Sequence, residues 1–207
     1  FFLMLVKKLM NFFLILVNEK IAGFAFSTFS NPIYYHILEN TDRHFIHFLE
    51  SIFNSQKEII SYQVKPTFKY LKLLHISNNA ALFDIQIAHY LVQPENSHQL
   101  DRLSENYLEY ELLPQEAETT FDKIVTSTCE KIEIYKQLYP LFKEELNKSN
   151  LYDLFQNLEM PLSEVLADME LAGIKLDPKV LEESSVVIAN ELKEIENKIY
   201  EYAGAPF

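Results

Sequence analysis

Phe12-Phe-Leu-Ile-Leu-Val17 is the first of three short apolar runs near the amino terminus, followed by Ile21-Ala-Gly-Phe-Ala-Phe26 and Ile33-Tyr-Tyr-His-Ile-Leu38. Ser30-Asn31-Pro32 precedes the third run and is typical of a turn. Apolar runs rich in β-branched and aromatic residues, bounded by turn residues, predict β-strands. We therefore expect a β-meander over residues 12–38.

The first run also invites a membrane or secretory interpretation, because Lys7 and Lys8 precede it. A membrane-spanning helix needs about 20 apolar residues, which this run does not reach. A signal peptide would end in a cleavage site of small residues, and Asn18-Glu19-Lys20 is not one. We favour a buried strand and expect no membrane contact.

Strands and helices alternate further along the chain. The spacing of apolar residues predicts a helix from Asp42 to Phe53, a strand over Glu58–Ser61, a helix over Thr67–Ile76, a strand over Ala80–Phe83 and a helix over Asp84–Leu91. Two more helices are predicted over Ser97–Tyr107 and Phe121–Leu146, with the polar loop Glu111–Thr120 between them. Such alternation predicts an α/β fold with a mixed sheet flanked by helices.

The remaining residues are predicted to be entirely helical. Leu151–Met169 carries apolar residues three and four apart, and Gly173 can end this helix. Asp177 and Pro178 are typical of the start of a second helix. We expect a long helical hairpin that cannot bury both of its apolar stripes alone.

Composition excludes several classes of protein. The chain has 207 residues, a net charge of −12 and three isolated glycines, so neither a glycine-rich phosphate loop nor a free-standing nucleic-acid binder is favoured. Its single cysteine, Cys129, excludes an internal disulfide and fits a reducing compartment, for which we expect the cytoplasm. The first residue is Phe1 and the last is Phe207, and we expect a piece of a longer polypeptide.

Residues 151–207 carry a series of motifs without a gap. They include Glu159-Met-Pro161-Leu162, Met169-Glu170, Gly173-Ile-Lys-Leu-Asp177 and Ala203-Gly204-Ala-Pro-Phe207. This series resembles the opening of the polymerase domain, leading into the thumb, of the A family of DNA polymerases that includes bacterial DNA polymerase I. Upstream, Phe83-Asp84 with its following helix and His98-Gln-Leu-Asp101 resemble the 3′–5′ exonuclease domain of the same family.

The resemblance implies a ribonuclease-H-like fold and a two-metal nuclease site, in which four carboxylates hold two divalent ions and a tyrosine orients water. The first pair of acids belongs at the end of the first strand, but no Asp or Glu precedes Glu19. Thr67 stands at the place of the third carboxylate and Lys131 at that of the fourth, while Ser127 stands at the place of the tyrosine. The resemblance therefore predicts no catalytic residue, no metal ligand and no cofactor in this chain.

Other polar residues have simpler interpretations. Asp84 is expected to cap a helix, and Lys65, Lys69 and Lys72 to form a solvated helix face, although they could also contact a phosphate backbone. His89 and His98 could form a metal site with Asp84 and Asp101, but they lack a matched ligand set. Cys129 is expected to be a small buried residue.

We thus expect an exonuclease-like α/β domain without activity over residues 1–148 and the helical base of the thumb over residues 149–207. The parent would be a DNA polymerase that uses Mg²⁺, with DNA and the palm, fingers and thumb of the same polypeptide as partners. Whether this chain is an enzyme stays open, because the polymerase motifs would lie downstream of it. Two alternatives remain: an independent protein-interaction module, and a residual 3′–5′ exonuclease.

Overall fold

A computed structural model describes residues 10–17, 20–28, 33–37, 43–55, 58–113 and 121–206. The chain divides into two compact units, Phe1–Leu171 and Ala172–Phe207, which are described separately. The expected boundary between residues 148 and 149 concerns where the polymerase part begins, and it stays a prediction.

The first unit is built on one sheet of five described strands in the order β3-β2-β1-β4-β5. Their bounds are Met10–Val17 (β1), Lys20–Thr28 (β2), Tyr34–Ile37 (β3), Glu58–Ser61 (β4) and Ala81–Asp84 (β5). The strands β1, β2 and β3 pair antiparallel, whereas β1 pairs parallel to β4 and β4 pairs parallel to β5. The expected meander and mixed sheet are confirmed.

The strand β1 occupies the middle of this sheet. It pairs with β2 from Met10 opposite Thr28 to Val17 opposite Lys20, with a register shift between Ile15 and Leu16. On its other side, Met10 lies opposite Ile59 of β4. A central strand has neighbours at both edges and helices over both faces of its sheet, which is typical of strands as apolar as residues 12–17.

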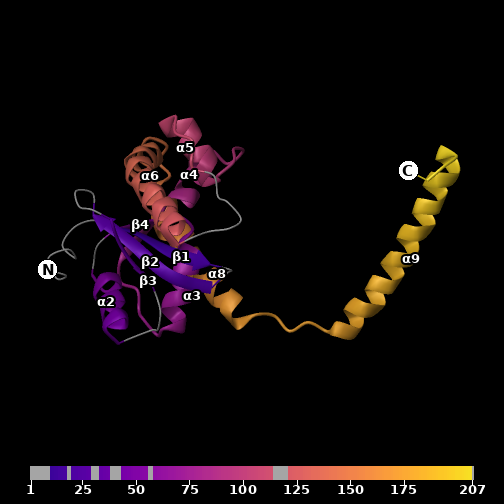
Figure 1. Cartoon of the computed structure of the whole chain (residues 1–207), viewed down its shortest axis with the longest axis horizontal. Coiled ribbons are helices and arrows are strands. Elements are labelled where there is room, and N and C mark those ends of the chain that lie inside the picture. Colours follow the sequence, from indigo (N-terminus) through magenta and orange to yellow (C-terminus); the bar gives the residue numbers. More distant parts are fainter. Residues whose placement is uncertain are drawn as a thin grey trace. The chain divides into compact units, whose positions relative to one another are not determined.

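Helices cover both faces of the sheet. Their bounds are Arg43–Phe53 (α2), Val64–Leu73 (α3), Ile85–Val92 (α4), Leu100–Leu108 (α5) and Phe121–Lys148 (α6). Figure 1 shows α4, α5 and α6 on one side of the strands and α2 and α3 on the other. The long helix α6 contacts β1, β2 and β4, so it crosses the centre of the sheet.

The hydrophobic core lies between these layers. Its largest fully buried side chains include Phe53, Phe83, Tyr135, Phe142 and Phe155. The ring of Phe83 in β5 stacks edge-on against Tyr139 of α6 at 4.9 Å and lies 4.8 Å from the ring of Phe155. Aromatic side chains from the sheet, from α6 and from the next helical segment therefore pack together.

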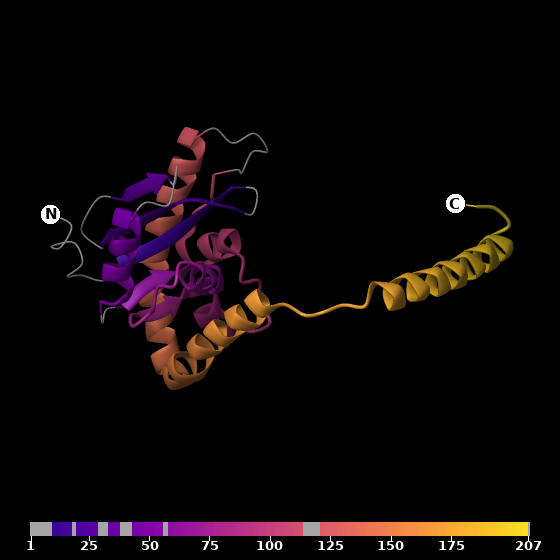
Figure 2. The ribbon, with the colours of Figure 1, turned by 90° about the horizontal axis from the view of Figure 1, so that it is seen from below.

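Residues 152–172 are helical but not uniformly α-helical. The stretch consists of Tyr152–Leu154 (α7), the π-helical turn Phe155–Glu159 (η1) and Met160–Ala172 (α8). The N–H of Met160 donates to the carbonyl oxygen of Phe155, five residues earlier. Figure 2 follows the chain from the end of α6 into this stretch. The expected continuous helix is therefore interrupted by a π turn.

Two predicted helix starts are wrong. The helix predicted from Thr67 begins at Val64, and the helix predicted from Ser97 begins at Leu100. The first starts early because a side chain distant in sequence caps it, as described below. The predicted loop Glu111–Thr120 falls partly outside the described residues, since residues 114–120 are not among them.

The second unit contains the helix α9, Pro178–Ala203. The carboxylate of Asp177 accepts a hydrogen bond of 3.0 Å from the N–H of Lys179, so the predicted cap is confirmed. Gly173 and Gly204 have φ of 68° and 78°, as residues that end helices require. A single helix buries neither of its faces, and the packing of a hairpin stays a prediction. No helix within the described ranges is long and apolar enough to cross a membrane.

Candidate functional site

A pocket opens where the carboxyl end of β4 meets α3, α5 and α6. Its cavity has a volume of about 660 Å³. Residues between 61 and 67 form one wall, residues between 99 and 105 form a second, and residues 111–113 with α6 residues between 127 and 135 complete it. Ends of parallel strands are the usual place for a site in an α/β fold.

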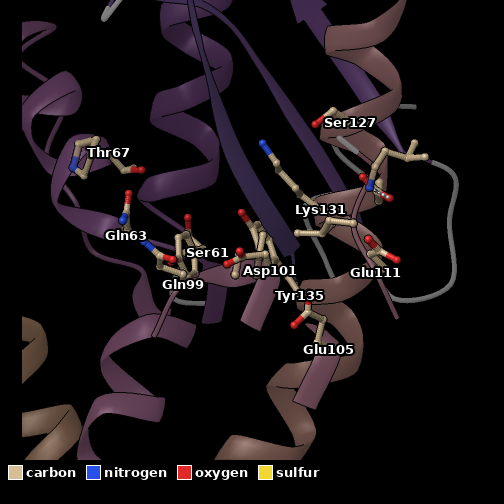
Figure 3. A pocket seen from close by; sticks show the side chains of 16 residues that line it. Ser61, Gln63, Thr67, Gln99, Asp101, Glu105, Glu111, Ser127, Lys131 and Tyr135 are labelled. Carbon is tan, nitrogen blue, oxygen red and sulfur yellow. Dashed lines mark hydrogen bonds between the residues drawn. The ribbon is translucent and has the colours of Figure 1, made fainter. Parts of the chain in front are cut away.

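The three positions singled out by the resemblance meet at this pocket. Thr67 of α3 lines one side, and Ser127 and Lys131 of α6 line the other (Figure 3). Ser127 and Lys131 are four residues apart, so they occupy one face of the same helix. Residues separated by more than sixty positions in sequence are thus brought to a single cavity.

Among the described residues that line the pocket, Lys131 is the one cation, and four others carry carboxylates. Burial lowers the pKa of the Lys131 ammonium, and the neighbouring Glu130 acts in the opposite direction. Glu130 is itself engaged, because its Oε1 accepts hydrogen bonds from the Tyr110 hydroxyl at 2.9 Å and from the Leu113 N–H at 3.0 Å. The other carboxylates are Asp101, Glu105 and Glu111. The lining is therefore predominantly acidic, which opposes binding of a phosphate backbone.

The residues present do not fit a pair of divalent ions. The sequence of β1 contains no Asp or Glu. Within the part of the chain that the structure describes, no group of three His, Cys, Asp or Glu side chains could hold a metal ion. Mg²⁺ requires a set of hard oxygen ligands, and an ammonium at the same place repels it.

Asp84 does not line the pocket, and its carboxylate binds backbone N–H groups at helix starts. Its carboxylate accepts hydrogen bonds from the N–H groups of Gln86 at 2.8 Å and Ile87 at 3.3 Å, which confirms the predicted cap of α4. It also accepts from Val64 at 2.7 Å and Gln63 at 3.3 Å, at the start of α3. Burial raises the pKa of the Asp84 carboxyl, whereas these four hydrogen bonds lower it. One side chain therefore caps two helices.

The three lysines of α3 lie on a partly exposed face that also contacts α8. Lys65 and Lys69 both form ion pairs with Glu170 of α8, at 2.6 Å and 3.1 Å. Lys72 pairs with Glu164 at 3.1 Å and with Asp168 at 2.9 Å. These ion pairs are not predicted from the sequence, because α8 supplies their carboxylates.

The remaining sequence candidates do not assemble into a site. His89 and His98 lie side by side, with 2.7 Å between their Nδ1 atoms. The two aspartates that the sequence offered as further metal ligands do not join this pair. Asp84 caps helices, and Asp101 lines the pocket. Cys129 is half-buried rather than buried, and burial raises the pKa of its thiol. A raised pKa disfavours the reactive thiolate.

Sequence inspection missed part of the pocket. Tyr62 lines it, and burial together with the charge of Asp84 raises the pKa of its hydroxyl to about 12. Glu105 and Glu111 line it as well. One signal was present for Glu105, because it follows Asp101 of the His-x-Leu-Asp motif by one helical turn.

A mixed sheet with helices on both faces and a pocket at the end of β4 is the architecture of a ribonuclease-H-like domain. The family model described as "DNA polymerase I, ribonuclease H-like domain" matches residues 16–123, and the chain belongs to this family.

Curated relatives agree with this assignment. The chain is 29% identical to DNA polymerase I of Borreliella burgdorferi over 166 residues, which cover 76% of this chain and 18% of the relative. It is 28% identical to DNA polymerase I of Bacillus subtilis over 170 residues, which cover 77% of this chain and 19% of the relative. The chain thus spans less than a fifth of the length of these relatives.

Solved structures share the fold. The polymerase domain of Pol1 from M. smegmatis, in complex with DNA primer-template and dNTP, matches 91% of this chain and 32% of its own, with a TM-score of 0.68 and 21% identity. NrnC from Brucella melitensis with bound Mg²⁺ matches 82% of this chain and 88% of its own, with a TM-score of 0.65 and 9% identity. At these identities the similarity concerns the fold alone.

Proposed function

We propose that this chain supplies the ribonuclease-H-like domain and the helices that follow it to a DNA polymerase I, and that its exonuclease-type site does not cleave DNA. The observation that supports this is that Thr67, Ser127 and Lys131, which the resemblance places at the positions of two metal-binding acids and a tyrosine, line one pocket. Two-metal hydrolysis needs ions on both the attacking and the leaving oxygen. An ammonium group supplies neither.

The role that remains for the domain is structural. The parent enzyme would add deoxynucleotides to a primer during repair and lagging-strand processing in the bacterial cytoplasm, with Mg²⁺ bound in its own palm. DNA would reach this chain through the full-length polymerase. The palm, fingers and thumb would be formed by residues that follow α9 in the same polypeptide.

A nuclease assay on the whole chain tests the loss of cleavage. With single-stranded or mismatched DNA and Mg²⁺ or Mn²⁺, we expect no 3′ digestion above the protein-free blank. If digestion is seen, the variants Asp101→Asn and Glu130→Gln distinguish its source, because these carboxylates line the pocket. Digestion that either variant abolishes would overturn the proposal, and digestion that both variants retain identifies a contaminating nuclease.

A second assay tests whether Lys131 stands at the position of a metal-binding acid. Lys131→Asp returns one acid to the pocket, and we expect no activity from it because the other ligands are still missing. Lys136→Asp is the matched control, since Lys136 lies on the same helix but does not line the pocket. Metal-dependent digestion by Lys131→Asp alone would mean that the assignment of these positions is wrong.

A further inference from the structure

The imidazole rings of His89 and His98 form a contact that depends on how many protons the two rings carry. His89 of α4 is 2% exposed, and its Nδ1 lies 2.7 Å from Nδ1 of His98, in the segment before α5. At this distance one nitrogen must donate a hydrogen and the other must accept it. The contact therefore survives one added proton, on the ring that donates, but not a second.

Aromatic rings enclose the pair and keep water away from His89. The ring of His89 lies 5.5 Å from that of Tyr107 in α5 and 5.3 Å from that of Phe142 in α6. His98 in turn lies edge-on to Tyr90 at 5.5 Å. Among the described residues, the titratable groups that contact the pair or its neighbours include the hydroxyls of Tyr62, Tyr90 and Tyr107, together with Glu145 of α6, whose charge acts on Tyr107.

Protonation of His89 is correspondingly unfavourable in the folded protein. Burial, and then the charge of His98, lower the pKa of His89 from 6.5 to about 4. In an opened segment both rings would contact water, and each would take up a proton near the ordinary histidine pKa of about 6.5.

The pair is connected to the pocket. The Tyr62 hydroxyl donates to the carbonyl oxygen of His98 at 2.9 Å and accepts from Nε2 of Gln86 at 3.2 Å. The residues that follow His98, from Gln99 to Asp101, line the pocket together with Tyr62. An interaction that holds His98 against α4 therefore also holds residues 99–101, which form one wall of the pocket, in place.

We propose that the His89–His98 contact is a pH-sensitive switch that keeps the pocket wall of residues 98–101 against α4 at neutral pH and releases it in acid. The switch does not depend on the function proposed above. The opened segment binds one proton more than the closed one between about pH 6.5 and pH 4. Each unit of pH in that window therefore favours opening by about tenfold.

Hydrogen exchange on the whole chain measures this opening. The N–H of Gln93 is bonded to the carbonyl of His89, and the N–H of Leu103 is bonded to that of Gln99, so both amides report on the segment. After correction for intrinsic exchange, we expect their opening constants to rise by about tenfold from pH 6 to pH 5. Amides of β4 and β5 should show no such rise.

The variant His89→Asn keeps a donor and an acceptor next to His98 but removes the titrating ring. We expect its opening constants to be independent of pH between 6 and 5. His75→Asn is the control, because His75 is exposed and its φ of 57° suits asparagine, and it should behave as the parent chain does. A pH dependence that persists in His89→Asn would overturn the proposal.

A measurement on the parent chain covers the case in which His89→Asn does not fold. Nitrogen NMR of the imidazoles reports the protonation of each ring. We expect His89 to remain neutral at pH 5 in the folded protein. A His89 ring that is already protonated at pH 5 would also refute the switch.

Discussion

Two helices of nearly equal length behave in opposite ways in this protein. The helix α6 has 28 residues and α9 has 26, and both carry apolar side chains along one face. In α6, residues such as Tyr135, Leu138 and Phe142 are buried, and they form part of the core. In α9 no residue is buried, and Leu192 is 61% exposed.

The comparison shows that the residues that set where a helix begins and ends are not the main source of its stability. The helix α9 has defined ends, with Asp177 and Gly204 as its caps. Packing differs, because α6 lies across the sheet whereas α9 is a single helix in its own unit. Local signals define where α9 begins and ends, but burial supplies most of the stability of helices in proteins.

The largest effect should follow from isolating the carboxyl-terminal helices. A peptide of residues 151–207 is expected to be weakly helical when dilute and to self-associate when concentrated. Isolation exposes the side chains of Phe155, Met160 and Ala167, which are buried in the first unit. Leaving about 400 Å² of apolar surface in water forgoes on the order of 10 kcal/mol, comparable with the stability of a whole domain. Circular dichroism over a range of concentrations, with sedimentation, measures this.

Residues 1–171, which include the buried Phe155, should fold without α9. In the peptide, Leu192→Glu with Ile195→Glu should abolish self-association, because both side chains belong to the exposed apolar stripe. A monomeric peptide with a cooperative thermal transition at all concentrations would contradict the expectation and favour an independent interaction module.

A pair of truncations compares the two helices directly. Phe142→Ala should lower the free energy of unfolding by about 3–5 kcal/mol, because Phe142 is fully buried. Leu192→Ala should change it by less than about 0.5 kcal/mol, since the side chain is exposed. Chemical denaturation of the whole chain gives both values. Equal losses would mean that α9 is as tightly packed as α6.

A smaller loss is expected from the shared cap. Asp84→Ala removes four hydrogen bonds at the starts of α3 and α4 and should cost about 2–4 kcal/mol. Asp177→Ala, at the exposed start of α9, should cost about 1 kcal/mol or less of helix stability. The denaturant midpoints of the two variants measure both losses of stability. A larger loss for Asp177→Ala than for Asp84→Ala would contradict this prediction.

The smallest effect concerns the ion pairs between α3 and α8. Lys72→Met should destabilise the first unit by less than about 1 kcal/mol, because the partly exposed pairs with Glu164 and Asp168 are screened by water. The difference from the parent chain should vanish in about 1 M salt. A loss that persists at high salt would show that the lysine stem, rather than its charge, carries the contact.

Much of the fold was predictable, because its signals are local. Apolar runs identified the strands, and Asp177, Pro178 and Gly173 marked helix ends where the structure has them. The start of α3 was not predictable, since Asp84, some twenty residues later, supplies its cap. Ion pairing of Lys72 also depends on α8, which no periodicity within α3 can reveal.

The site was predictable in part. Thr67, Ser127 and Lys131 were named through the resemblance, and the structure brings all three to one pocket. The acidic lining was missed because it comes from elements with no shared sequence pattern. His89 and His98 were noticed as residues, but their pairing depends on the path of residues 93–99.

The π turn at Phe155–Glu159 makes the number of residues in this stretch as important as their identity. An α-helix turns by about 100° for each residue, so an insertion or deletion rotates everything that follows. Loss of one residue within the π turn would convert it to regular α-helix with little rotation of α8, whereas loss of exposed Leu162, in α8 itself, would rotate the residues that follow by about 100°. Glu164, Asp168 and Glu170 would then face away from the lysines of α3. A deletion of one uncharged residue would thereby break ion pairs in which it takes no part.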